Sequence, residues 1–110
     1  MSAATTQFPT ATILAYPRIG RNRELKRALE ARWAGRITEA ELIQAANDLR
    51  KENLARLVEL GLNPSDASLA EAPSLYDHVL DATILLGAIP PRFAGREGLD
   101  LYFALARGDD

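Results

Sequence analysis

The feature that most constrains this chain is an apolar run that is stopped by a proline and followed by a basic helix start. Residues 12–16 (Thr-Ile-Leu-Ala-Tyr) have the composition of a short buried strand. Pro17 ends that run, because proline lacks the N–H that a strand ladder needs. Gly20 permits a turn, and Asn22 is a favourable N-cap for a helix that begins at Arg23. The sequence therefore predicts a strand, a turn and a helix in this order.

Positively charged side chains crowd the start of this helix, and Glu24 is the only acid in its first turn. Because the first N–H groups of a helix attract negative charge, cations gathered there favour a site for a carboxylate or a phosphate. Solvated surface cations beside a loop explain the same residues equally well. The residues alone leave both interpretations open. The cations are Arg18, Arg21, Arg23, Lys26 and Arg27.

Charge is divided unevenly along the chain, whose formal net charge is −2. Residues 1–36 contain seven Arg or Lys against two Glu, a net of +5, whereas residues 37–110 contain six against thirteen acids, a net of −7. A local basic region in an acidic chain suits a small anionic ligand better than a long polyanion. Since no aromatic platform or basic stripe accompanies it, nucleic acid is not an expected partner.

The composition also argues against a metal site and a membrane segment. The chain has no cysteine, which excludes thiolate metal sites, and its single histidine, His78, cannot make a metal site without several carboxylates nearby. We expect no cofactor in this chain. Residues 1–10 lack the basic and apolar regions of a signal peptide and are expected to be disordered. No apolar run has the length needed to span a bilayer. The sequence predicts a soluble cytoplasmic domain with no membrane partner.

Residues 23–60 predict a helical hairpin. The first helix is expected over about residues 23–34, with Gly35 as a left-handed C-cap. Thr38 and Glu41 have the spacing of a capping box at the start of the second helix. The apolar stripe of the second helix could be a groove for a partner, but we favour a buried core, because such stripes are usually buried.

The remaining residues predict a loop and two further helices. Residues 62–73 are polar and bounded by prolines, as is typical of a loop. Ser74 is expected to cap a helix over about residues 74–86. A last short helix is expected over about residues 99–107.

His78 lies between two aspartates in the third of these helices, an arrangement that could serve acid–base chemistry. Asp81 follows it by about one helical turn and could orient the imidazole ring. No nucleophile or second histidine accompanies the pair in the sequence. We therefore favour a structural or surface role for His78.

Several segments together resemble the N-terminal domain of the cobalamin-independent methionine synthases. They occur in the order and spacing of that family, so the likeness extends over almost all of residues 12–108. Each motif alone is weak, whereas the ordered set is specific. The matching residues are 13–20 (ILAYPRIG), 22–26 (NRELK), 33–35 (WAG), 49–53 (LRKEN), 74–81 (SLYDHVLD), 85–90 (LLGAIP) and 101–108 (LYFALARG).

The resemblance implies an α/β fold, the start of a (β/α)8 barrel, in which this portion is predominantly helical with one or two short strands. It implies transfer of a methyl group from 5-methyltetrahydropteroyltriglutamate to homocysteine in methionine biosynthesis, by an enzyme whose C-terminal barrel holds zinc. The zinc and homocysteine sites of the family lie beyond residue 110. We therefore do not expect this chain to catalyse the transfer alone, which leaves open whether it is itself an enzyme.

In the family, the segment that matches residues 23–26 contacts the polyglutamate tail of the folate. The resemblance therefore implies that Arg23 and Lys26 pair with glutamate carboxylates, while the two residues between them contribute backbone groups. The candidate residues for binding folate polyglutamate are Arg23, Glu24, Leu25 and Lys26, with Arg18 and Arg21 as candidates for additional anion contacts.

The chain also departs from the family pattern. Ala15 stands where the family has glycine, Leu54 where it has tryptophan, and residues 63–73 are polar where it has an apolar strand. The last difference supports an alternative, a free-standing helical module that kept the anion site and lost the chemistry. Exposed apolar surface would favour self-association of such a chain.

Overall fold

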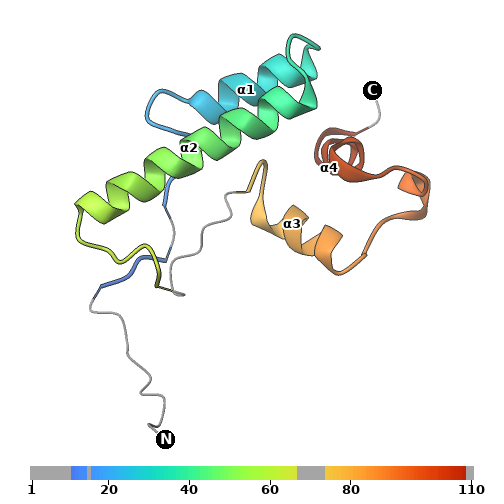
Figure 1. The fold of residues 1–110 in the computed structure, drawn as a ribbon. Helices are drawn as coiled ribbons and strands as arrows, with labels where there is room; N and C mark the ends of the chain where they lie inside the picture. The colour runs from blue at the N-terminus through green and yellow to red at the C-terminus, as the bar shows by residue number, and fades with distance from the viewer. Residues whose placement is uncertain (1–10, 15, 67–73, 109–110) are drawn as a thin grey trace, which may run out of the picture.

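The computed structural model describes residues 11–14, 16–66 and 74–108, and within these ranges the chain is helical (Figure 1). The disorder expected for residues 1–10 concerns residues outside the described ranges. No helix in these ranges combines the length and the apolar character needed to cross a membrane. The elements are α1 (Glu24–Trp33), α2 (Glu39–Glu59), α3 (His78–Leu85), the short 3-10 helix η1 (Pro91–Phe93) and α4 (Gly98–Arg107).

The structure does not show the short strand expected at residues 12–16, one residue of which lies outside the described ranges. Ile13 packs against Leu57 and Leu62, whereas Leu14 is fully exposed. A strand needs a neighbour to take its N–H and C=O groups, and no strand occurs elsewhere in the described part of the chain. The one or two short strands expected from the resemblance are therefore not seen, and the α/β class remains an inference from the family.

Helices α1 and α2 pack side by side as an antiparallel hairpin, whose interface is the main core (Figure 1). Leu42 and Leu49 are buried there, which confirms the interpretation of the α2 stripe as core over this part of the helix, whereas Leu60 at its end is 59% exposed. Between the helices Gly35 has a φ of +70°, which lets the Arg36 N–H donate to the Ala31 carbonyl at 2.8 Å and end α1. The buried residues of this core are Leu25, Leu29, Leu42 and Leu49.

The start of α2 has the capping box that the sequence predicts. The Glu41 N–H donates to the Thr38 hydroxyl oxygen at 3.2 Å, and the Thr38 N–H donates to the Glu41 carboxylate at 2.7 Å. The pKa of Glu41 lies below its ordinary value, chiefly because its carboxylate accepts that backbone hydrogen bond. Two donors that a bare helix start would leave unpaired are thus satisfied.

Helix α3 begins later than expected, at His78. Asp77 is its N-cap and accepts a hydrogen bond from the Val79 N–H at 2.8 Å. The expected cap, Ser74, is buried instead, with its hydroxyl 3.3 Å from the Tyr102 hydroxyl of α4. Ser74 therefore contacts Tyr102 of α4 and does not make the α3 cap that the local sequence pattern predicts.

Helix α4 connects the C-terminal part of the chain to the hairpin. It packs against α3 and η1, and Phe103 meets the Trp33 ring of α1 edge-on, with ring centroids 5.7 Å apart. The Arg107 guanidinium also lies over the Trp33 ring, 4.1 Å from the ring centroid. These contacts hold α4 beside the core that α1 and α2 form.

Candidate functional site

The start of α1 is built differently from the expected Asn22 cap. Arg23 is the N-cap, in the left-handed conformation (φ 60°, ψ 37°), and no side chain caps it. The Arg23 N–H donates to the Gly20 carbonyl at 3.2 Å, and the Leu25 N–H donates to the Ile19 carbonyl at 2.9 Å. The preceding turn, rather than the Asn22 side chain, therefore satisfies the first donors of the helix.

The carboxylate of Glu24 folds back over this turn. It accepts a hydrogen bond from the Asn22 N–H at 3.0 Å and lies so close to Gly20 that an added Cβ there would be 2.0 Å from the Glu24 Oε2 atom. The pKa of Glu24 lies below its ordinary value of 4.5, because the carboxylate accepts hydrogen bonds first from its own backbone N–H and then from Asn22, with Arg27 adding attraction. The chain thus supplies part of the negative charge that the helix start favours.

The four candidate residues for binding polyglutamate have different environments. Arg23 and Lys26 are exposed at the helix start, and the Lys26 Nζ atom lies 3.6 Å from a Glu30 carboxylate oxygen in an exposed pair, which holds it only weakly. Leu25 is buried, and its N–H already donates to Ile19. The backbone contribution expected of Leu25 stays a prediction, and in this structure its N–H is already paired, whereas the side chains of Arg23 and Lys26 are exposed.

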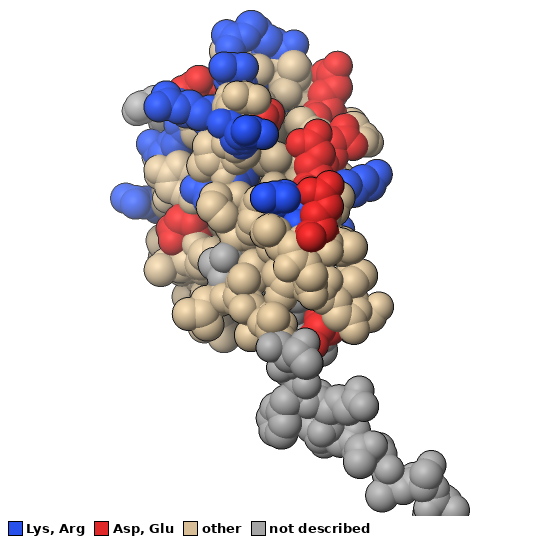
Figure 2. Space-filling model, turned by 90° about the vertical axis from the view of Figure 1, so that its left-hand side faces the viewer, with Lys and Arg blue, Asp and Glu red and all other residues tan. Residues whose placement is uncertain are grey.

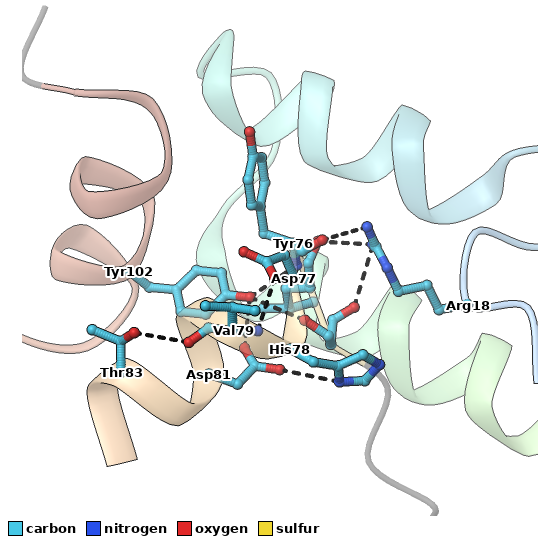
Figure 3. A network of polar contacts seen from close by, with 10 residues as sticks. Arg18, Tyr76, Asp77, His78, Val79, Asp81, Thr83 and Tyr102 are labelled. Atoms are coloured by element: carbon cyan, nitrogen blue, oxygen red, sulfur yellow. Dashed lines mark hydrogen bonds and ion pairs between the residues drawn. The ribbon is translucent and has the colours of Figure 1, made fainter. Parts of the chain in front are cut away.

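The two additional cations also differ. Arg21 is exposed in the turn before α1. The guanidinium of Arg18 donates to the carbonyl oxygens of Ser74 at 3.4 Å and Leu75 at 3.2 Å, and also to that of Tyr76 (Figure 3). The additional anion contact expected of Arg18 stays a prediction, and in this structure its N–H groups donate to backbone acceptors.

One face of the molecule has a basic end (Figure 2). Lys and Arg side chains gather at its upper end, and Asp and Glu side chains line one side. Carboxylates bound by such cations form charge-assisted hydrogen bonds, which are shorter and stronger than neutral ones. The arrangement can therefore hold a flexible chain of carboxylates, while offering few free backbone donors.

A buried hydroxyl that the sequence analysis did not identify organises the C-terminal half. The Tyr102 hydroxyl accepts a hydrogen bond from the Tyr76 N–H at 2.8 Å and donates to an Asp81 carboxylate oxygen at 2.8 Å (Figure 3). Burial raises the pKa of Tyr102. Sequence spacing gives no signal for this network, because Tyr102 lies 21 to 28 residues from its partners.

The candidate acid–base pair proves to be part of this network. The other Asp81 carboxylate oxygen lies 3.8 Å from the His78 Nδ1 atom, and the His78 side chain is 77% exposed. Asp81 thus lies near an exposed imidazole and accepts a hydrogen bond from the Tyr102 hydroxyl. This geometry agrees with a structural or surface role for His78.

The zinc ion that the resemblance implies finds no ligand set in the part of the chain that the structure describes. These residues contain no group of three or more His, Cys, Asp or Glu side chains that could hold a metal ion, and the whole sequence has no cysteine. Structural and catalytic zinc sites take three or four such ligands. The described residues therefore do not fit a zinc site.

Comparison with known proteins points to one family. Residues 10–110 match the family described as cobalamin-independent synthase, N-terminal domain. A 5-methyltetrahydropteroyltriglutamate–homocysteine methyltransferase of Rhodococcus jostii (strain RHA1) is 51% identical over 102 residues, 92% of this chain. Proteins of the same name from Streptomyces coelicolor and Acidiphilium cryptum are 48% and 52% identical over 89% of the chain. The chain spans only 13% of the length of each of these relatives.

Proposed function

Since the chain belongs to the cobalamin-independent methionine synthase family and matches its N-terminal domain, we propose that it binds the polyglutamate tail of a methylated folate. The observation that carries this proposal is the pair of exposed cations, Arg23 and Lys26, at the start of α1. The relatives are named for a substrate with three glutamates. A basic helix start suits such a chain of carboxylates.

Side-chain cations hold the tail in this proposal. The guanidinium of Arg23 presents a planar fork that matches a carboxylate, and the Lys26 ammonium acts as a second point charge. Because Glu24 and the turn use the nearby N–H groups, the backbone makes a smaller contribution than a bare helix start would make. The affinity should therefore fall as salt screens the two exposed charges.

The reaction proposed for the whole enzyme is methyl transfer from 5-methyltetrahydropteroyltriglutamate to homocysteine. The part played by this chain is to bind and orient the folate, and we do not expect it to catalyse the transfer alone. The described residues provide no metal ligand set. An assay of methionine formation by this polypeptide with both substrates checks this expectation, which steady turnover would contradict.

Titration calorimetry with 5-methyltetrahydropteroyltriglutamate tests the proposed binding site. Arg23→Gln and Lys26→Gln should each weaken binding about tenfold, because each removes a charge-assisted contact. Arg92→Gln is the matched control, since Arg92 is exposed and lies over the Phe93 ring, 4.8 Å from its centroid. Equal affinities for the wild type and the two α1 variants would contradict the proposal.

The alternative is a free-standing helical module that binds anions through the same residues. It remains a prediction from the altered residues 63–73, and the described structure gives it no separate support. The length of the ligand separates the two hypotheses. A polyglutamate site should prefer the triglutamate to the monoglutamate form of the folate, whereas a general anion module should bind inorganic phosphate as tightly as either.

A further inference from the structure

Arg18 makes contacts of a kind that the proposed binding site does not use. Its guanidinium donates to three successive carbonyl oxygens, those of residues 74–76, which lie 56 to 58 residues further along the chain (Figure 3). The contacts come from two nitrogens of one planar guanidinium, Nη1 to the carbonyls of residues 74 and 75 and Nη2 to that of residue 76. Lysine also has three N–H donors, but they lie on a single nitrogen and do not reproduce this fixed fork, so lysine should replace arginine only in part. Arg18 thus ties the segment before α1 to the segment before α3.

The segment that accepts these hydrogen bonds, residues 74–76, is itself held in place. The Tyr76 N–H donates to the Tyr102 hydroxyl at 2.8 Å, and the Ser74 hydroxyl lies 3.3 Å from the same oxygen. The Tyr102 hydroxyl in turn donates to Asp81 of α3. Residues 74–76 are therefore anchored to both α3 and α4, and they offer Arg18 a fixed set of acceptors.

Arg18 is followed directly by the turn that begins α1. The two residues after Arg18 supply the carbonyls that accept the Leu25 and Arg23 N–H groups, at 2.9 and 3.2 Å. Arg23 is the one residue other than glycine with positive φ in the described ranges. A left-handed arginine is unfavourable, and it persists only where the surrounding contacts determine it. The turn from Arg18 to Arg23 provides those contacts.

We propose that Arg18 is a positioning residue, which fixes this turn and thereby keeps the left-handed Arg23 and the following Lys26 in the arrangement that binds carboxylates. The effect on ligand affinity rests on the proposed function, whereas the effect on the turn does not. Without these three contacts, the turn loses the hydrogen bonds that join it to residues 74–76, which are themselves anchored to α3 and α4. Arg23 then samples ordinary helical and extended conformations.

Amide hydrogen exchange measured by NMR tests the effect on the turn. In Arg18→Gln the Arg23 and Leu25 amides should exchange about tenfold faster than in the wild type, because the carbonyls that hold them become mobile. The amide of Leu49, in the middle of α2, should be unchanged. Arg18→Lys should give an intermediate acceleration, and Arg92→Gln should give none.

Triglutamate affinity, measured on the same variants, tests the consequence for binding. Arg18→Gln should weaken binding about tenfold, with Arg18→Lys restoring part of the loss. Unchanged exchange at Leu25, or equal acceleration at Leu25 and Leu49, would overturn the positioning role and leave a general loss of stability. If the wild-type chain does not bind the triglutamate, the proposed function fails, and the exchange rates alone decide whether Arg18 positions the turn.

Discussion

Gly20, in the turn before α1, has no room for a larger side chain. Its φ is +92°, and a Cβ added there would lie 2.0 Å from the Glu24 Oε2 atom and 3.1 Å from the Leu49 Cδ1 atom. Gly35 also has positive φ, but an added Cβ would meet nothing within 4 Å. The two glycines therefore share the conformational requirement and differ in crowding.

Urea unfolding of the two alanine variants can test this difference in crowding. Gly35→Ala should lower the free energy of unfolding by about 1 kcal/mol, the cost of a left-handed alanine. Gly20→Ala should cost about 2–3 kcal/mol, because it also displaces the Glu24 carboxylate and presses on Leu49. Equal losses for the two variants would show that the Glu24 carboxylate does not occupy the space over Gly20.

The Tyr102 hydroxyl should also contribute measurably to stability. Tyr102→Phe keeps the ring but removes the hydroxyl that pairs with Tyr76, Ser74 and Asp81. We expect the free energy of unfolding to fall by about 1–3 kcal/mol, since partly buried polar groups lose their partner. Tyr76→Phe is the control, because the Tyr76 ring is partly exposed and points away from the network in Figure 3. A loss no greater than that of the control would contradict the role of the hydroxyl.

The starts of α1 and α2 share one feature, a glutamate whose side chain folds back on the preceding residues. The carboxylates of Glu24 and Glu41 accept the N–H groups of Asn22 and Thr38, respectively. Hydrogen bonds to these carboxylates lower the pKa of both groups below 4.5. A carboxyl group with a lowered folded pKa stabilises the fold above its unfolded pKa, and this stabilisation is lost as the pH falls through the folded pKa.

The stability of the chain should therefore be nearly constant from pH 7 to about pH 5 and should decrease below about pH 4.5. In the Glu24→Gln/Glu41→Gln double variant, we expect lower stability at neutral pH and a smaller further loss in acid. Urea midpoints at pH 6 and at about pH 3 measure the two losses. Glu52→Gln, at an exposed position of α2, is the control and should keep the wild-type pH dependence.

How much of each element the sequence could predict depends on how local its signals are. The start of α2 follows from Thr38 and Glu41, three residues apart, and the structure has that capping box. The start of α3 does not, since Ser74 and Asp77 are both good caps and only the burial of Ser74 against Tyr102 decides between them. At the candidate site the cations are plain from the sequence, but the acceptors of Arg18 are 56 to 58 residues away.

The absence of a strand in the described residues has its explanation at the scale of the whole molecule. The apolar run before Pro17 has the right composition, but a strand forms only against a neighbour that takes its backbone groups. The Cα radius of gyration is 17.3 Å, whereas a compact domain of about this size has roughly 13 Å. The chain therefore leaves surfaces uncovered that a more compact fold would bury, and sequence patterns alone do not reveal which surfaces these are.

One uncovered apolar surface lies on α3 and the residue that follows it. Val79, Leu85 and Leu86 are 74%, 85% and 81% exposed. The one acid of this helix, Asp81, is turned toward Tyr102, so no charge of the helix itself opposes contact. In an antiparallel pair of α3 helices, Val79 of one copy would lie beside Leu86 of the other, with the small Ala82 at the crossing. The surface is thus complementary to itself.

We expect the isolated chain to self-associate weakly through this surface. Three large side chains from each copy fall short of the roughly 1,200 Å² that stable specific interfaces bury, so the dissociation constant should be of the order of 100 µM. In sedimentation velocity the apparent mass should rise with concentration from 12.0 kDa toward twice that value. Leu85→Lys/Leu86→Lys should keep the chain monomeric, whereas Val58→Lys/Leu60→Lys, at exposed positions near the end of α2, should not. A wild-type chain that stays monomeric at 500 µM, or an association that survives charges on α3, would show that another surface or another polypeptide covers this helix.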